Sequence, residues 1–342
     1  MRAPLERSVR RMWRGEPGLL TTGLTLVAAP LSAVFGTVVR LRGFLYDSGV
    51  LPGRRGPIPV VSVGNLAVGG TGKTPVAAWL ARTLAHRGWK PAIVLRGYGK
   101  DEILLHRRWN PGVPVVASGN RVRGVQAAAA EGADIAVLDD GFQHRQLLRD
   151  LDLVLLSPEH PLPPRLLPRG PFREPLSALR RAHLVLVTAK GGAELPPAHR
   201  LVDALSGLRG IPSARVFSLG DGEWCALGGD PFPPPAGPPL VITSVGSPEP
   251  FLRSVLSRVG ATSGHLAFAD HHAFTTRDAV SIRRAAGGAW IATTEKDAVK
   301  LAPFRELLPE VRVLPLVPNP PETLETEILN ALEARLRSGA SP

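Results

Sequence analysis

Residues 60–74 read VVSVGNLAVGGTGKT, and this stretch decides the fold. Its first part, Val60–Val63, has the apolar, β-branched composition of a buried strand. The part that follows matches the phosphate-binding pattern G-x-x-x-x-G-K-[ST], except that Ala67 replaces the first glycine. A helix-like stretch, Thr74–Arg87, comes next, and the N-terminus of such a helix favours phosphate through its free N–H groups and its dipole. Strand, glycine-rich loop and helix in this order predict a P-loop that binds a nucleotide.

The P-loop pattern assigns a task to each polar group in it. Backbone N–H groups should converge on phosphate oxygens, Lys73 should reach the β- and γ-phosphates, and Thr74 should ligate Mg²⁺. The predicted nucleotide-binding residues are Gly69, Gly70, Thr71, Gly72, Lys73 and Thr74. Lys73 is also predicted to be catalytic, because its charge is aimed at the transferred phosphoryl group.

Two adjacent acids follow the apolar run Ile135–Leu138. An acid at the carboxyl end of a parallel strand is what a P-loop protein supplies to magnesium. Successive side chains of extended backbone point to opposite sides, so one acid can serve the metal and the other a second task. We predict Asp139 as the metal ligand and Asp140 as a catalytic residue.

Apolar runs alternate with helical stretches from residue 58 onward, and candidate helices such as Thr74–Arg87 and Val122–Glu131 lie between the runs. Continuous apolar strands separated by helices are typical of a parallel, doubly wound α/β sheet. The predicted strands are Val60–Val63, Ala92–Leu95, Ile135–Leu138, Leu153–Leu156, Leu184–Val187 and Val216–Leu219.

The domain prediction rests on one segment, Gly228–Pro239, which is rich in glycine and proline and is typical of a linker. After it, Leu240–Val245, Trp290–Thr293 and Val311–Leu316 predict a smaller α/β unit. The expected division is 1–45 for an N-terminal membrane-associated helix, 46–227 for the P-loop domain, 228–239 for the linker and 240–342 for the smaller domain.

Composition narrows the class of partner. The chain has 342 residues, of which 44% are hydrophobic, so it can bury a large core. Its formal charge of +12 favours polyanions: nucleic acid, anionic lipid or phosphorylated substrates. A single cysteine, Cys225, excludes an internal disulfide framework and a cysteine-rich zinc site.

The N-terminal stretch Pro17–Val39 contains no charged residue and would reach roughly 35 Å as a helix, against a hydrocarbon core of about 30 Å. Its basic flanks are Arg7, Arg10, Arg11 and Arg14 before it and Arg40 and Arg42 after it. Basic residues on both sides favour a helix lying in, or dipping into, an anionic cytoplasmic leaflet. A true span and a helix packed on soluble protein remain alternatives, and a cleaved signal peptide is disfavoured because a P-loop domain follows.

The nucleotide site alone leaves GTPase, ATPase and kinase open. A guanine site usually carries N-K-x-D, and the nearest runs here are TAKG at 188–191 and TEKD at 294–297. Neither matches, so guanine recognition is disfavoured.

Several strings are too unusual to be generic. They are GN at 64–65, RGYG at 96–99, DDGFQH at 139–144, LPRGPFREP at 167–175, FADHH at 268–272 and TEKDAVK at 294–300. In order and spacing the chain resembles the tetraacyldisaccharide 4'-kinase (lipid A 4'-kinase) family from about residue 15 to residue 302, and that family does not keep the first glycine of the P-loop.

The resemblance implies that MgATP phosphorylates the 4'-hydroxyl of a tetraacylated glucosamine disaccharide 1-phosphate, giving the lipid IVA precursor of lipopolysaccharide. It implies ATP and Mg²⁺ as cofactors, the lipid A precursor and a membrane surface as partners, and the cytoplasmic face of the bacterial inner membrane as the location. No nucleic acid and no obligate protein partner are expected.

The resemblance also implies the site residues. In place of a longer family segment ending in Gly-Asp-Glu-Pro, this chain reads GKDEILL at 99–105, which aligns the family's catalytic aspartate with Asp101. His271 is its expected partner, and the histidine is expected to tune an aspartate that is otherwise too acidic for an efficient base. Further expected contacts are Glu174 to the metal, Gln143 to the nucleotide, and Arg121, Arg173 and His144 to the substrate. Lys296 and Asp297 are expected to border the cleft between the domains.

Two rival classes remain at this level. A membrane-associated P-loop ATPase that drives a partner would more readily position water than keep a catalytic aspartate in an Asp-Glu motif. A nucleic-acid-binding NTPase is suggested only by the charge, since the basic residues are not interleaved with aromatics as a stacking surface requires.

Overall fold

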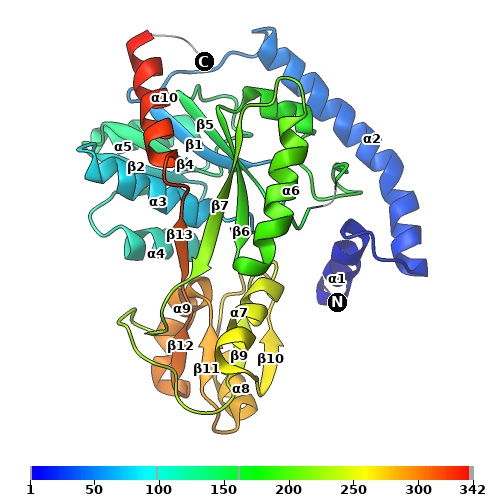
Figure 1. Cartoon of the computed structure of the whole chain (residues 1–342), viewed down its shortest axis with the longest axis vertical. Coiled ribbons are helices and arrows are strands. Elements are labelled where there is room, and N and C mark those ends of the chain that lie inside the picture. The colour runs from blue at the N-terminus through cyan, green and yellow to red at the C-terminus, as the bar shows by residue number, and fades with distance from the viewer. Residues whose placement is uncertain (1, 98, 161, 339–342) are drawn as a thin grey trace.

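The computed structural model describes residues 2–97, 99–160 and 162–338, and Figure 1 shows two α/β lobes with a helical arm at the N-terminus. The large lobe is built on an eight-stranded sheet of order β13-β7-β6-β5-β1-β4-β2-β3, and the small lobe on a five-stranded sheet of order β10-β9-β11-β12-β8. Of the residues in the sequence motifs, Tyr98 lies outside the described residues, and so does the side chain of Arg7 in the basic flank.

The large sheet has the predicted doubly wound form. Its strands are β1 (Val60–Asn65), β2 (Pro91–Leu95), β3 (Val115–Ala117), β4 (Ile135–Asp139), β5 (Leu151–Leu156), β6 (Leu184–Lys190), β7 (Ala214–Asp221) and β13 (Leu316–Asn319). All neighbouring pairs are parallel except β13 with β7. The fold prediction is therefore confirmed, and β1 lies directly between β4 and β5.

Alternation along the strands explains why helices cover both faces. Val61 and Val63 of β1 point into a core that includes α3 and α10, whereas Val60 points into a core with α5 on the opposite face. The helices of this lobe are α3 (Lys73–His86), α4 (Lys100–Trp109), α5 (Arg121–Ala130), α6 (Leu195–Ser206) and α10 (Leu324–Ser338), with the short 3₁₀ turns η1 (Leu176–Arg181) and η2 (Gly192–Glu194).

The small lobe repeats the parallel pattern on a smaller scale. Its strands are β8 (Cys225–Ala226), β9 (Leu240–Thr243), β10 (Gly264–Ala267), β11 (Ile291–Thr293) and β12 (Val311–Val313), and its helices are α7 (Glu249–Val259), α8 (Thr276–Ala286), α9 (Glu295–Leu301) and the 3₁₀ turn η3 (Ala302–Leu307). The predicted strand Val311–Leu316 is split: β12 ends at Val313, and Leu316 begins β13, which pairs with β7 of the large sheet. The domain boundaries stay a prediction, to which the structure adds that β13 and α10 return to the large lobe.

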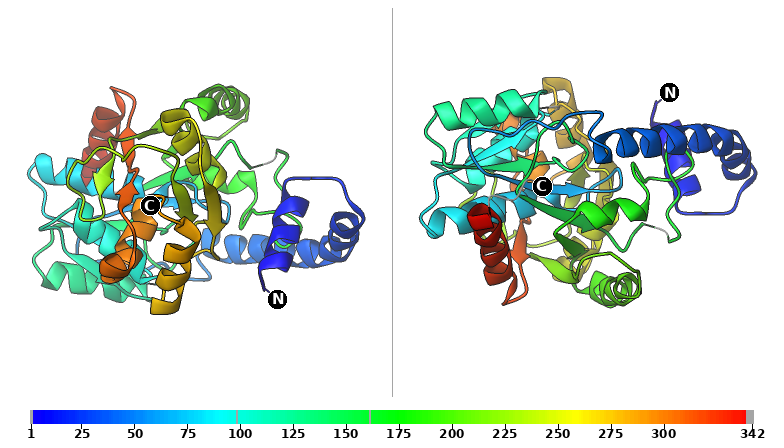
Figure 2. Two further views of the ribbon diagram at one scale, coloured as in Figure 1. Left: turned by 90° about the horizontal axis from the view of Figure 1, so that it is seen from below. Right: turned by 90° about the horizontal axis from the view of Figure 1, so that it is seen from above.

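The N-terminal arm consists of two helices, α1 (Arg2–Trp13) and α2 (Leu19–Asp47), which project to one side of the body (Figure 2). The predicted apolar helix thus extends to Asp47, and α1 precedes it. A row of small residues on α2, Thr21, Ala28 and Gly36, is buried. Its large apolar side chains are exposed instead: Leu19, Leu20, Leu26, Val27, Leu31, Val34, Val38, Leu41 and Phe44. By length and composition α2 is the one described helix able to cross a membrane.

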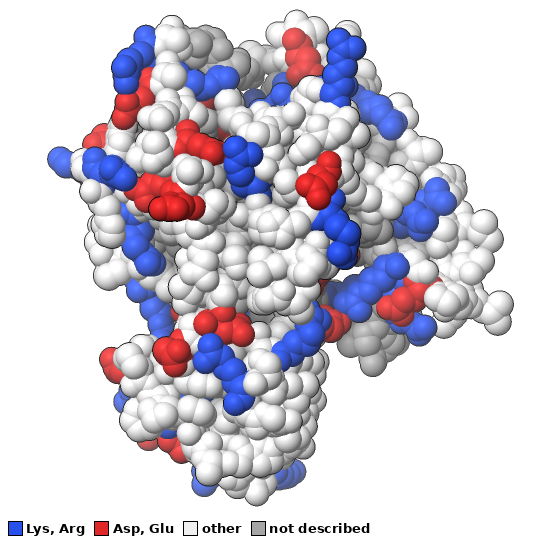
Figure 3. Space-filling view, in the orientation of Figure 1, with Lys and Arg blue, Asp and Glu red and all other residues white. Residues whose placement is uncertain are grey.

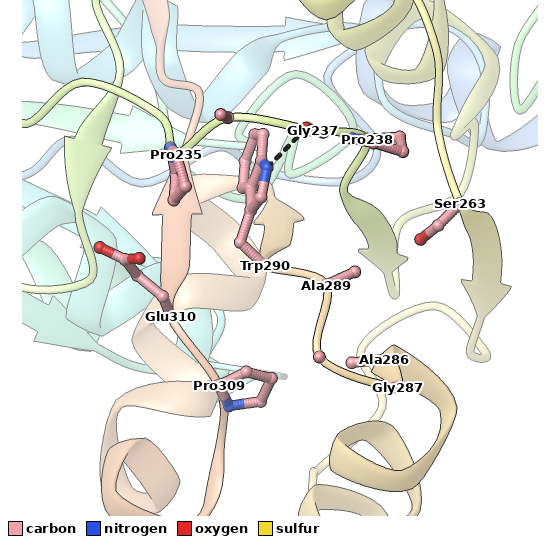
Figure 4. A pocket seen from close by; sticks show the side chains of 12 residues that line it. Pro235, Gly237, Pro238, Ser263, Ala286, Gly287, Ala289, Trp290, Pro309 and Glu310 are labelled. Carbon is pink, nitrogen blue, oxygen red and sulfur yellow. Dashed lines mark hydrogen bonds between the residues drawn. The ribbon is translucent and has the colours of Figure 1, made fainter.

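The small lobe exposes different side chains at its junction with the large lobe and in a cavity elsewhere on its surface. Side chains of both charge signs gather where the small lobe meets the large one (Figure 3). A cavity of about 400 Å³ in the small lobe is lined mostly by Pro, Gly and Ala, and Trp290 Nε1 donates a hydrogen bond to the Gly237 carbonyl there (Figure 4). Apart from Trp290, its lining side chains with polar atoms are Ser263 and Glu310.

Candidate active site

The P-loop turns between β1 and α3 in the predicted way. Gly72 caps α3 in the left-handed region with φ of 82°, and a Cβ on this residue would lie 2.7 Å from Leu219 Cδ1. Gly69 has φ of 118°. Both positions therefore require glycine, for conformation and, at Gly72, for space.

A buried asparagine supports the loop from beneath. Asn65 Nδ2 donates to the Ala67 carbonyl at 2.6 Å and to Thr71 Oγ1 at 2.8 Å. Thr188 Oγ1, at the end of β6, donates to the Thr71 carbonyl at 2.8 Å. These contacts fix the loop before any phosphate arrives. The sequence places Asn65 in the GN string and Thr188 in the TAKG run, and neither pattern predicts this supporting role.

Lys73 lies in an acidic environment. Its Nζ is 3.8 Å from Asp140 Oδ1, and burial lowers the pKa of the ammonium although Asp140 opposes that shift. Asp140 has φ of 62°, a conformation that costs free energy outside glycine and is often kept at functional sites. Burial raises the pKa of Asp140, but the charges of Lys73 and Arg173 outweigh burial and the pKa lies below its ordinary value.

Arg173 and Gln143 complete this group. Arg173 Nη1 donates to Asp140 Oδ2 at 3.0 Å and to Gln143 Oε1 at 3.2 Å, and Gln143 Nε2 donates to the Asn65 carbonyl at 2.7 Å. The structure thus brings together four of the predicted residues, Lys73, Asp140, Gln143 and Arg173, at the carboxyl ends of β1 and β4.

The other acid of the pair faces a different partner, although Asp140 lies beyond the end of β4 in the left-handed region and not in the extended backbone that the prediction assumed. Asp139 Oδ2 is 2.9 Å from His106 Nε2, and both side chains are buried. Glu102 lies on the same helix as His106, and burial together with the charge of Asp139 raises the pKa of Glu102. Neither Glu102 nor His106 is among the predicted site residues. Spacing could have flagged them, because Glu102 and His106 are separated by one helical turn.

Asp101 and His271 meet across the two lobes although 170 positions separate them. His271 Nδ1 is 3.1 Å from Asp101 Oδ2, and His271 holds its backbone in the left-handed region with φ of 57°. The hydrogen bond to Asp101 raises the pKa of His271. Burial raises the pKa of Asp101, but the hydrogen bond from His271 and the charge of Lys296 outweigh it, so the pKa of Asp101 is lowered. The expectation that the histidine makes this aspartate less acidic is therefore wrong, because a hydrogen-bond donor favours the carboxylate.

Lys296 is the third member of this cluster. Its Nζ lies 3.3 Å from His271 Nε2, 3.3 Å from Asp270 Oδ1 and 3.8 Å from Asp101 Oδ2. Next to it, Asp297 is fully buried and accepts a hydrogen bond from the Ser244 backbone N–H. The Ser244 carbonyl in turn accepts a hydrogen bond from the His271 backbone N–H. The TEKD string therefore places one side chain on the Asp101–His271 pair and anchors the loop beneath His271.

Two of the predicted substrate residues lie near the acidic group. Arg121 is 3% exposed, donates to the Ser118 carbonyl and leaves its Nε without a partner among the described residues. Burial lowers its pKa, while the charges of Asp140 and Asp139 act to raise it. Burial, with the charges of Arg121 and Arg149, lowers the pKa of His144 to about 4, so this imidazole is neutral at physiological pH.

Glu174 is predicted as a metal ligand, but its observed contact is with a different kind of partner. Its carboxylate pairs with Arg181, whose guanidinium stacks over the Phe142 ring. Within the described residues no group of three or more His, Cys, Asp and Glu side chains is arranged to hold a metal ion. The acids whose charges act on Lys73 are Asp140, Asp139 and Glu102.

A cavity of about 760 Å³ opens beside the P-loop at Gly69 and Gly70. Arg10 and Arg14 of α1 line it on one side, and Arg253 of α7 lines it on another. Its size is that of a small-ligand site, so there is room for a nucleotide next to the loop.

Comparison with known proteins agrees with this geometry. The sequence model of the family described as tetraacyldisaccharide-1-P 4'-kinase matches residues 24–103 and 99–333. The two matches overlap at residues 99–103, within the segment that is predicted to be shorter than in the family. A tetraacyldisaccharide 4'-kinase of Anaeromyxobacter sp. (strain K) is 41% identical over 324 residues, covering 84% of each chain. That of Geobacter sulfurreducens is 35% identical over 354 residues, covering 93% of this chain and 97% of its own.

A solved structure is also similar. LpxK from Aquifex aeolicus, crystallised in complex with ATP, superposes with a TM-score of 0.70 at 28% identity, covering 90% of this chain and 99% of its own.

Proposed function

Because this chain belongs to the tetraacyldisaccharide-1-P 4'-kinase family, we propose that it transfers the γ-phosphoryl group of ATP to the 4'-hydroxyl of a tetraacylated glucosamine disaccharide 1-phosphate. The product is lipid IVA, and the chain is a lipid kinase of lipid A biosynthesis. The observation that carries this assignment to particular residues is the contact between Asp101 and His271, made across the lobes close to the P-loop acids.

The nucleotide half of the reaction is assigned to the P-loop. The backbone N–H groups of Gly69, Gly70 and Gly72 would hold the phosphates, and Lys73 would neutralise charge on the transferred group. The donor set also fits magnesium, because Thr74 stands in the first turn of α3 and the carboxylates of Asp139 and Glu102 are near enough for their charges to act on each other. Thr74, Asp139 and Glu102 would hold Mg²⁺, which would neutralise negative charge on the phosphates during the transfer.

The acceptor half is assigned to Asp101. The 4'-hydroxyl gives its proton to the Asp101 carboxylate as its oxygen bonds to the γ-phosphorus, and the bond from that phosphorus to the bridging oxygen of ADP breaks. Asp101 is ionised at neutral pH because its pKa is lowered, so it can accept a proton without first losing one.

Lys296 would set the tautomer of His271. An ammonium group can only donate, so His271 Nε2, at 3.3 Å, must accept. The ring proton is then on Nδ1 and is donated to Asp101. His271 thereby fixes Asp101 Oδ2, while Oδ1 accepts a hydrogen bond from the Glu102 backbone N–H at 3.1 Å and would take the proton of the sugar hydroxyl on its second lone pair.

The basic groups would hold the anionic lipid. Arg121 and Arg173 carry the charge, and neutral His144 has a buried Nε2 without a hydrogen-bond partner among the described side chains. A phosphorylated disaccharide offers oxygens for such donors. An ATPase that drives a partner would have no use for this set.

The direct test uses purified protein with MgATP and tetraacyldisaccharide 1-phosphate. We expect one phosphate to be added per lipid, and none to a lipid in which the 4'-hydroxyl is replaced by hydrogen. Mass spectrometry of the lipid and a parallel assay of ADP check the stoichiometry. ADP release without a phosphorylated lipid would contradict the kinase assignment and favour an ATPase.

We also propose that α2 holds the enzyme on the cytoplasmic face of the bacterial inner membrane. Nine large apolar side chains of α2 are exposed. The arm also contacts the loop before Arg173: Ser32 Oγ donates to the Leu166 carbonyl, and Trp13 Nε1 donates to the Pro168 carbonyl. A lipid substrate would thus reach the site along the helix that is in the membrane.

The membrane proposal predicts the effect of changing four exposed side chains, Leu20, Leu26, Leu31 and Val34, to Gln. Each apolar side chain kept out of the bilayer loses about 1.5–3 kcal/mol of transfer free energy, so flotation with anionic phospholipid vesicles should be largely lost. MgATP affinity should not change. Leu256→Gln with Val280→Gln, on exposed apolar residues of the small lobe, is the matched control. Equal flotation of the α2 variant and its control would refute the anchor.

A further inference from the structure

Helix α4 carries a buried histidine that the proposed chemistry does not use. His106 Nε2 lies 2.9 Å from Asp139 Oδ2, and the exposed fractions of the two side chains are 0% and 4%. A carboxylate can only accept, so Nε2 must carry the proton and donate it. The other ring nitrogen, Nδ1, is buried without a hydrogen-bond partner among the described residues. Burying an imidazole nitrogen without a hydrogen-bond partner costs free energy. The one hydrogen bond that this ring does make therefore calls for an explanation.

The place of Asp139 explains what that bond can do. Asp139 ends β4, next to the strand that leads into the P-loop, and its charge acts on Lys73. A hydrogen bond to one oxygen of a metal-ligating carboxylate orients the other oxygen. His106 holds Oδ2, so Oδ1 would be the oxygen offered to the metal.

The contact between His106 and Asp139 also fixes the position of the acids on α4. Glu102 and His106 are one helical turn apart on α4, so both face Asp139, and Asp101 begins the same helix. At its other end, Trp109 Nε1 donates to Glu295 Oε1 at 2.7 Å, and Arg108 Nη1 donates to the Leu227 carbonyl. His106 therefore fastens α4 to β4 midway between the acids at its start and the small lobe at its end.

We propose that His106 is a positioning residue that orients Asp139 toward the Mg²⁺ of bound MgATP. The proposal rests on the nucleotide half of the proposed function and not on the identity of the lipid. Groups that hydrogen-bond to metal-ligating side chains typically contribute 10–100-fold to metal affinity, and this is the effect expected here.

The test compares two amides that differ in reach. The side-chain nitrogen of His106→Gln can occupy the place of Nε2, whereas that of His106→Asn stops near Nδ1 and cannot reach Asp139. Calorimetry without lipid gives ATP affinity in EDTA and at a series of Mg²⁺ concentrations. We expect unchanged affinity in EDTA for both, a 10–100-fold loss of the Mg²⁺-dependent part for His106→Asn, and near wild-type behaviour for His106→Gln. His199→Asn, on an exposed histidine of α6, is the control.

Several outcomes would overturn the proposal. Equal Mg²⁺ dependence in His106→Asn and wild type would show that Asp139 needs no support. Equal losses of Mg²⁺-dependent affinity in His106→Gln and His106→Asn would show that the hydrogen bond to Asp139 is not the cause. A loss in EDTA as large as that in Mg²⁺ would make His106 a residue that only maintains the fold, and thermal unfolding of each variant gives a check on this. Because no lipid is present, a failure of the lipid kinase assignment leaves the result unaffected.

Discussion

Lys73→Ala is expected to lower turnover about 10³-fold, the upper end of the range for removing one preorganised donor to a developing charge. The Lys73 ammonium is buried beside Asp140 and lies at the start of α3, where the phosphates would be held. The fold should persist, because Asp140 keeps its hydrogen bonds from Arg173 when the lysine is removed.

The measurement is steady-state turnover with lipid and MgATP, with circular dichroism to verify the fold. Lys90→Ala, on an exposed lysine of the same lobe, is the control and should retain wild-type turnover. A folded Lys73→Ala protein with turnover close to that of the control would mean that the phosphate site lies elsewhere.

Asp101→Ala and His271→Ala should each lower the catalytic rate by about 10²–10⁴, the range for a general base. The double variant should cost much less than the product of the two single losses, because the residues are in contact and act as one unit. ATP affinity should survive in all three. Turnover of the two single variants and the double variant gives the coupling directly. Independent, multiplicative losses would separate the pair, and an active Asp101→Ala would show that the shortened segment is aligned wrongly.

The same pair predicts a pH dependence that serves as its second readout. The pKa of His271 lies above its ordinary value, so the ring gains a proton as the pH falls through that raised value. The charged ring stabilises the Asp101 carboxylate and makes it a weaker base, and it breaks the contact with Lys296. The rate constant kcat/KM should therefore fall on the acid side, with an apparent pKa above 6.5, and His271→Gln should remove this limb. An acid limb that persists unchanged in His271→Gln would belong to another group.

The sequence was sufficient for the parts of the site that are local. The P-loop needs residues 69–74 in one turn between a strand and a helix, and the string itself specifies them. Two acids at the end of an apolar strand were sufficient to assign Asp139 and Asp140 to the phosphate site, whereas the position of β4 beside β1 is decided by the tertiary structure. The family strings also identified Asp101 and His271 as partners, and their side chains are in contact in the structure.

The structure decided which side chains neighbour one another when chain distance is large. His106 meets Asp139 because the fold brings α4 to the carboxyl end of β4, and the one-turn spacing of Glu102 and His106 in KDEILLHRRW cannot reveal that distant partner. Glu174 was expected at the metal, yet its carboxylate pairs with Arg181, a partner that only the folded chain brings to it. The sequence placed Lys296 at the cleft between the domains, but it did not predict the contact of Lys296 with His271.

The sequence by itself determined the fold class, the nucleotide loop, the apolar helix and the family, because each of these is written in a short run of residues whose physical preferences act locally. Only the tertiary structure decided the direction in which Asp101 titrates, the extent of the arm from α1 to Asp47, and the return of β13 to the large sheet. These depend on burial and on charges brought together from distant parts of the chain. A hydrogen bond from His271 and the ammonium of Lys296 outweigh the burial of Asp101, and that balance exists only once the two lobes meet.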